Sequence, residues 1–178
     1  MMKFWRENVW AAGFAAFIRI FLGYQWLSSG LPKLTGATPF TAEGFLNNVI
    51  TNPVMNKATG EPLYPLFNSF VEHVALPNIK IINILVPWGE VLIGAGLILG
   101  TLTLTAAFFG LVMNFMFMFA GTVSSNPWLL LLGFIVVLAG ANAGRFGLDR
   151  YVLPWLGKKT GGKLFRRAEA GPAFRVIK

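Results

Sequence analysis

Two charged side chains lie inside long apolar stretches of the sequence, where charge is rare. Arg19 lies within the stretch from Val9 to Ser29, and Glu90 lies within the stretch from Ile79 to Leu99. A charge at the centre of a membrane helix costs about 2.5–3.5 kcal/mol on insertion scales, so such residues are functional candidates by default. An arginine can hold an anion or a carbonyl oxygen, and a glutamate can transfer a proton. Arg19 and Glu90 are therefore the predicted catalytic residues.

The depth of these residues predicts that they meet. At 1.5 Å per helical residue, Arg19 and Glu90 each lie roughly 16 Å from the end of their stretch. The two helices would run in opposite directions, so we expect an ion pair between Arg19 and Glu90. Asn114, in a third apolar stretch, falls in the same layer. The pair is compatible with a functional pocket and equally with a purely structural contact that holds the two helices together.

Small and aromatic residues accompany the polar groups at helical spacing. On the first stretch, one face is formed by residues spaced 4, 3, 4 and 3 apart, namely Arg19, Gly23, Trp26, Gly30 and Lys33. The corresponding face of the second stretch carries Asn83, Pro87, Glu90 and Gly94. We therefore expect a ligand-binding site lined by Arg19, Trp26, Lys33 and Asn114. Glycines at these positions allow either close helix packing or room for a ligand.

Asn142 is the strongly polar residue of the fourth apolar stretch. It is followed by Arg145 and Asp149, near the predicted end of the membrane-spanning region. The cluster is compatible with a structural clamp at the membrane boundary or with ligand binding. Asn142 is therefore included among the predicted binding residues.

Composition excludes several classes of chemistry. Hydrophobic residues make up 55% of the 178 residues and charged residues 12%, whereas soluble domains carry about 25% charged residues. The chain has no cysteine and one histidine, His73. This excludes disulfides, thiolate metal sites, dithiol relays and multi-histidine sites. We therefore expect a membrane protein without a bound metal.

Four apolar stretches position the candidate residues, and each is long enough to cross a membrane as a helix. They cover about residues 9–29, 79–99, 102–122 and 127–144. Because the later joints are short, neighbouring helices must be antiparallel. The predicted fold is all-α: an antiparallel bundle of four transmembrane helices in one domain, residues 1–150. The embedded arginine and the later spans argue against a cleaved signal peptide at the start.

The joint between the first two stretches, residues 30–78, is longer than the others. Within it, Phe40–Ile50 and Leu63–Leu76 mix apolar and polar residues and flank a breaker-rich stretch. This pattern predicts two short helices outside the membrane. They could act as a lid over the bundle or as a plain connector.

Charge predicts the orientation. Residues 145–178 hold nine Lys and Arg against two acidic residues, and an even number of spans places both termini on one side. The positive-inside rule therefore puts both termini in the cytoplasm and the long joint outside the cell membrane. We expect the basic tail, residues 151–178, to rest on anionic lipid headgroups rather than on nucleic acid.

Three motifs in order resemble those of the DoxX/DoxD family of four-helix integral membrane proteins. The first combines RIFLG (Arg19–Gly23) with GLPKL (Gly30–Leu34), and the second is GEVLIGAGLILG (Gly89–Gly100). The third is AGANAGRFGLD (Ala139–Asp149). The resemblance covers about residues 15–149. The long first joint is similar to that of family members with an external insert.

The resemblance implies membrane-bound redox chemistry, with quinone as co-substrate and a small sulfur compound such as thiosulfate as electron donor. Lys33 would attract the anion, Arg19 would bind it or a quinone carbonyl, and Glu90 would move the proton. Whether the chain is itself an enzyme stays open. The alternatives are a carrier or binding protein for a small anion or lipid-like molecule, and an assembly subunit of a redox complex. A homo-oligomer and a redox partner subunit are both compatible with the sequence.

Overall fold

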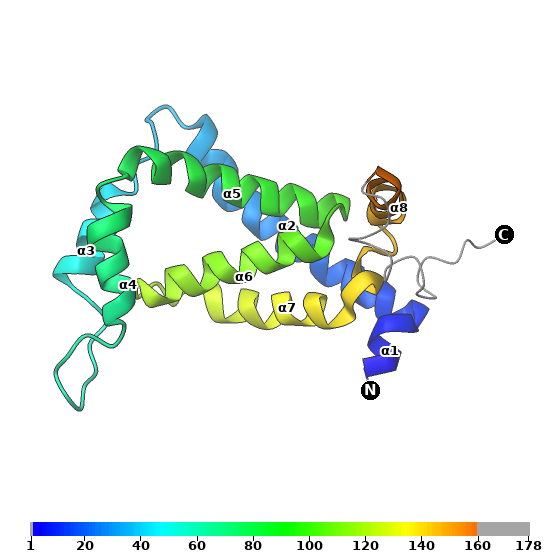
Figure 1. The fold of residues 1–178 in the computed structure, drawn as a ribbon, viewed down its shortest axis with the longest axis horizontal. Helices are drawn as coiled ribbons and strands as arrows, with labels where there is room; N and C mark the ends of the chain where they lie inside the picture. The colour runs from blue at the N-terminus through cyan, green and yellow to red at the C-terminus, as the bar shows by residue number, and fades with distance from the viewer. Residues whose placement is uncertain (1, 160–178) are drawn as a thin grey trace.

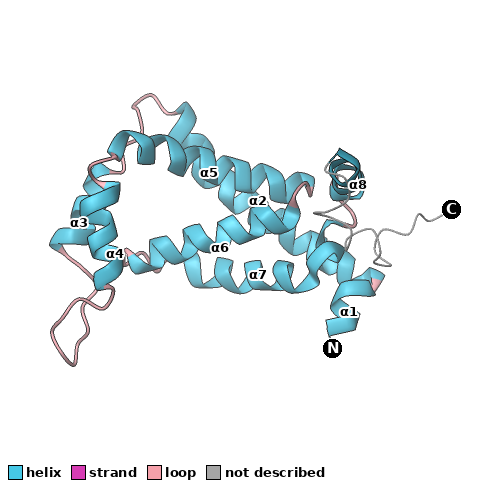
Figure 2. Cartoon of the chain, viewed as in Figure 1, coloured by secondary structure: helices cyan, strands magenta, loops and turns pink. Residues whose placement is uncertain are grey.

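The computed structural model describes residues 2–159 and is all-α, as predicted. Figures 1 and 2 show helices joined by loops, with one isolated bridge between Met55 and Pro62 in the described part. In chain order the elements are α1 (Met2–Glu7), α2 (Val9–Thr35), α3 (Glu43–Thr51), α4 (Pro65–Phe70), the π-helical turn η1 (Val71–Ala75), α5 (Ile79–Leu99), α6 (Thr103–Phe119), α7 (Asn126–Ala139), the 3-10 turn η2 (Gly140–Gly144) and α8 (Asp149–Lys159).

Four long helices form the body of the molecule. Helices α2, α5, α6 and α7 lie lengthwise beside one another, with α3 and α4 at one end and α1 and α8 at the other (Figure 1). The main core lies between the four helices and includes Leu22, Trp26, Leu97 and Val136. The two short helices predicted in the long joint are confirmed as α3 and as α4 with η1.

Two helix boundaries differ from the apolar stretches. Helix α2 continues past Ser29 to Thr35 and ends where Gly36 is extended, with φ −63° and ψ 151°. Backbone hydrogen bonding continues a helix whether or not its side chains are apolar, so the end of an apolar stretch is a poor guide to the end of a helix. At the other end of the chain, the first nine residues of the predicted tail belong to α8. Residues 160–178 of that tail lie outside the described part.

Glycines bring α2 and α5 into close contact. A Cβ added to Gly23 would lie 2.8 Å from the carbonyl oxygen of Gly94 and 2.9 Å from the amide nitrogen of Ile98. A Cβ added to Gly30 would lie 2.8 Å from the Cβ of Glu90. Such contacts between small residues let helix backbones approach closely in membrane proteins. They also determine which residues of the two helices face one another.

We expect Gly23→Ala to destabilise the protein by about 1–3 kcal/mol, because the added methyl group meets backbone atoms that cannot move aside. Gly13→Ala is the matched control, since Gly13 lies in the same helix and has no atom within 4 Å of its added Cβ. That control should be neutral or slightly stabilising, because alanine favours helix more than glycine does. Unfolding of both variants in mixed detergent micelles measures the difference. Equal stability would contradict the close contact.

The segment between α2 and α5 has a small core of its own. Leu46 and Val49 of α3 pack against Val71 and Ala75 of η1. The side-chain oxygen of Asn83 in α5 accepts a hydrogen bond of 2.8 Å from the backbone N–H of Ala42. Ring contacts, including Tyr64 with Phe119 at 4.8 Å, join the same segment to the end of α6. The long joint is therefore a packed cap on one end of the bundle.

The surface of the bundle is apolar on all four long helices. Within residues 2–159, two segments are long and apolar enough to cross a membrane: Ile79–Leu99 and Asn126–Gly144. Only 28% and 39% of their most apolar windows are buried within the protein, so most of that apolar surface faces outward. Helix α6 is apolar but shorter, and polar residues such as Arg19 interrupt the apolar run of α2. Large exposed apolar side chains nevertheless occur on each helix: Trp10, Phe17, Ile84, Leu92, Phe108, Trp128 and Leu131.

Candidate functional site

A buried carboxylate and a lysine form an ion pair at the capped end of the bundle. Both carboxylate oxygens of Glu90 lie 2.5 Å from Nζ of Lys33, which donates to them. The side chain of Glu90 is 2% exposed and that of Lys33 is 28% exposed. Nζ of Lys33 also lies 5.6 Å from the centre of the Phe40 ring. Lys33 therefore connects a buried acid to the rim of the bundle beneath the cap.

The predicted ion pair between Arg19 and Glu90 is wrong. Glu90 is paired with Lys33, and Arg19 lies beside Gly100 at the far end of α5. Gly30 faces Glu90 across the contact between α2 and α5. Arg19 precedes Gly30 by eleven residues in α2, so it lies roughly 16 Å from the level of Glu90 along the helix axis. The predicted pairing would require the two apolar stretches to begin and end at the same levels along the bundle. In the structure the N-terminal part of α2 extends past α5 and contacts α7 and η2.

Arg19 is buried among backbone groups at the opposite end of the bundle from Lys33. Arg19 as a whole is 1% exposed, and its guanidinium lies against Gly100 and Gly147. Asp149 is the acidic group that acts on it electrostatically. The Nε and Nη1 atoms of Arg19 are nevertheless buried without a hydrogen-bond partner. Arg19 and Glu90 therefore belong to two separate polar sites.

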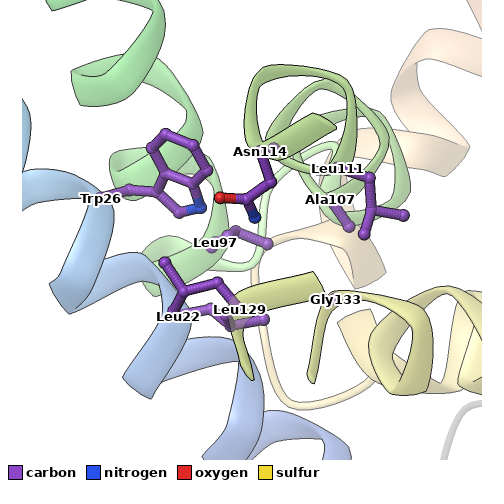
Figure 3. Close-up of a pocket in the computed structure, with 9 residues that line it drawn as sticks. Leu22, Trp26, Leu97, Ala107, Leu111, Asn114, Leu129 and Gly133 are labelled. Atoms are coloured by element: carbon purple, nitrogen blue, oxygen red, sulfur yellow. The ribbon is translucent and has the colours of Figure 1, made fainter. Parts of the chain in front are cut away.

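Trp26 and Asn114 lie between these two sites, on facing helices. They line a small cavity (Figure 3), together with apolar residues that include Leu22, Leu97 and Leu111. About 10 Å³ of it is available to the centre of a water molecule, which is room for about one water. The side-chain oxygen of Asn114 is buried without a hydrogen-bond partner. The cavity therefore has room for about one water but not for a quinone ring.

Asn142 acts as a structural clamp. Its side-chain amide donates two hydrogen bonds of 2.9 Å, one to the backbone oxygen of Trp5 and one to that of Asn8. Arg145 donates to the backbone oxygen of Glu7 at 3.4 Å. These bonds fasten the junction of α1 and α2 to η2. Asn142 does not line the cavity beside Trp26 and Asn114. Its amide therefore lies apart from the other candidate binding residues.

Sequence reasoning placed Asp149 only at the membrane boundary and did not include Thr103. In the structure Oδ2 of Asp149 accepts a hydrogen bond of 3.1 Å from the backbone N–H of Thr103. An acidic residue in the first turn of a helix is common, because the helix dipole favours negative charge there. The sequence therefore indicated that Asp149 could begin a helix. It did not indicate that α6 also begins beside the carboxylate of Asp149.

Comparison with known families supports one conclusion. The sequence model of the DoxX family matches residues 14–125, which covers most of α2, the cap, α5 and α6. The matched range contains the first two motifs, while the motif at residues 139–149 lies beyond it. No curated protein and no solved structure gives a significant match. Since more than half of the chain matches, the protein belongs to the DoxX family of membrane proteins.

Proposed function

We propose that α2, α5, α6 and α7, the last extended by η2, are four membrane spans of a multi-pass protein of the cell membrane. Exposed apolar side chains on each of these helices support this arrangement. Helices α1 and α8 both lie at the end opposite the cap (Figure 1), and by the positive-inside rule the lysines and arginines near them support a cytoplasmic position for that end. The cap would then lie outside the cell.

We further propose that the protein is a quinone-linked oxidoreductase, or the membrane subunit of one, acting on a small sulfur compound such as thiosulfate. Two thiosulfate ions would join through a new S–S bond and lose two electrons. One quinone would take up these electrons and two protons to become a quinol. The chain has no cysteine, so the electrons pass directly between substrates or through a redox partner subunit.

The contact between Lys33 and Glu90 is the observation that carries this proposal. Glu90 is a proton-transfer group held away from water, and Lys33 is a donor that reaches both the carboxylate and the rim. In that position Lys33 can donate a hydrogen bond to a quinone carbonyl while Glu90 supplies or receives the proton. Proton transfer at this pair would satisfy the proton requirement of quinone reduction.

The size of the cavity beside Trp26 and Asn114 supports a quinone position at the rim. The space beside Trp26 and Asn114 holds about one water, so this cavity does not admit a quinone ring. Lys33 is 28% exposed and lies below Phe40. A quinone would therefore approach from the lipid, under the edge of the cap. An anionic sulfur donor would approach the same lysine from the external side.

Quinone reduction in native membranes tests this proposal. Membranes from the source organism lacking this chain should reduce a quinone analogue with thiosulfate only after the chain is restored. We expect Lys33→Gln and Glu90→Gln each to lower the rate at least about tenfold, as loss of a general acid–base group does. Lys80→Gln is the matched control, because Lys80 is an exposed cation in the first turn of α5.

The outcomes separate the reaction from the site. No thiosulfate-dependent quinone reduction after restoring the parent chain would contradict the reaction. A full rate in the Lys33 variant, with the protein correctly inserted, would contradict the site.

A second candidate function is binding or carriage of a small anion or lipid-like molecule without electron transfer. Nε and Nη1 of Arg19 favour it, because they are buried donors without an acceptor in the structure, and redox chemistry at Lys33 does not use them. Uptake into vesicles without any change in redox state would support this candidate.

A further inference from the structure

Helix α4 and the π-helical turn η1 form one continuous helical segment of the cap, residues 65–75. Its apolar residues form two neighbouring rows at helical spacing. The first row packs within the core of the cap: Phe67, Val71 and Ala75. The second row is Leu66, Phe70 and Val74, and these residues are 87%, 46% and 48% exposed. The described part of the chain therefore leaves much of the second row uncovered.

The apolar side of this segment faces the end of the bundle. The ring of Phe67 lies 5.8 Å from that of Phe119 at the end of α6. Figure 1 shows α4 crossing that end of the bundle rather than continuing along its long axis. By helical periodicity the polar residues lie on the side opposite to both apolar rows: Asn68, Ser69, Glu72 and His73. With the long helices as membrane spans, the segment lies along the membrane surface with its apolar side toward the membrane.

A row of aromatic rings connects this segment with the apolar outer surface of the bundle. Phe119 contacts both Phe67 of the cap and Phe115 of α6, with 5.8 and 6.1 Å between ring centres. Phe115 in turn lies 6.4 Å from Phe134 of α7, and both of these residues are exposed. The surface that lipid covers on α6 and α7 therefore continues onto α4. This continuity favours lipid, rather than a soluble partner, as the cover of the exposed row.

The charge of the segment indicates the kind of lipid contact. Interfacial helices that bind anionic headgroups carry Lys and Arg on their polar side. Residues 62–79 contain neither, and Glu72 and His73 are their titratable side chains apart from Tyr64. The contact with the membrane would therefore come from apolar burial and would not require anionic lipid.

We propose that Leu66, Phe70 and Val74 insert into the outer leaflet of the membrane, at the boundary between headgroups and acyl chains. Helix α4 and η1 then form an interfacial helix that holds the cap against the membrane surface. This inference rests on the four-span arrangement proposed above and is independent of the redox reaction.

Single spin labels test this contact, because the chain has no cysteine of its own to react with the label. Leu66→Cys and Phe70→Cys each place a label on the exposed apolar row. Ser69→Cys and Glu72→Cys are matched controls on the polar side of the same segment. In nanodiscs of phosphatidylcholine, each label collides with molecular oxygen, which concentrates in lipid, and with a nickel complex, which stays in water. We expect the ratio of oxygen to nickel collision rates to be several-fold higher at positions 66 and 70 than at positions 69 and 72.

A fifth label separates this inference from the arrangement of the spans. Leu92 is an exposed residue of α5, so Leu92→Cys should give a high ratio if α5 spans the membrane. A low ratio at position 92 would overturn the four-span arrangement and this inference with it. A high ratio at position 92 with low ratios at positions 66 and 70 would overturn this inference alone. Loss of collisions with both reagents at positions 66 and 70, with magnetic broadening between labels, would also overturn it and show that a second copy covers the row.

Discussion

Lys33→Met should destabilise the protein by roughly 3–5 kcal/mol, the cost of leaving a buried charge without its partner. The Glu90 carboxylate is 2% exposed, and Lys33 Nζ is the only cation in the described part of the chain that forms an ion pair with it. Methionine keeps the length of the lysine side chain but removes its charge and its donors. Reversible unfolding in mixed detergent micelles, monitored by tryptophan fluorescence, measures the loss.

The double variant Lys33→Met with Glu90→Met is the control for this result. A buried ion pair replaced by apolar residues of similar size is often neutral or stabilising, so the double variant should regain most of the stability lost by Lys33→Met. Glu90→Met alone should cost less than Lys33→Met, because Lys33 is partly exposed and can hydrate its charge. A double variant that loses the sum of the two single losses would show that the residues act independently.

Gly100→Ala is expected to be the most damaging single methyl addition at the other end of the bundle. Gly100 has a φ of +64°, and an L-residue in this left-handed region costs roughly 1–2 kcal/mol. The added Cβ would also overlap the Arg19 guanidinium and lie 2.8 Å from Cα of Gly147. Overpacking adds about 1–3 kcal/mol. We therefore expect a total loss of roughly 2–5 kcal/mol in the same unfolding assay.

Gly60→Ala separates the two contributions. Gly60 has a φ of +73° but nothing within 4 Å of its added Cβ, so this variant carries the backbone strain without the overlap. The free energy of unfolding should fall only by the cost of the backbone strain, roughly 1–2 kcal/mol. If Gly100→Ala is no worse than Gly60→Ala, the guanidinium is not packed against Gly100. There would then have to be space beside Arg19 for the methyl group added at Gly100.

Much of the architecture could be predicted because it depends on local periodicity. The spacing of Arg19, Gly23, Trp26 and Gly30 predicts one face of a helix, and all four residues are buried. Pro87, Glu90 and Gly94 of the corresponding face are buried as well. The two short helices of the cap were predicted from apolar segments that flank a stretch rich in proline, glycine and asparagine. Each of these features involves residues within a few turns of one another.

The sequence by itself determined which faces of α2 and α5 point to the interior and that Arg19 and Glu90 are buried, since a 3.6-residue period defines rotation about a helix axis. Only the tertiary structure decided which buried groups meet, because periodicity says nothing about translation along that axis. The contact of Gly23 with Gly94 determines this translation. It places Lys33, rather than Arg19, beside Glu90. Arg19 lies close to Asp149 only because the chain returns to the same end of the bundle after α7.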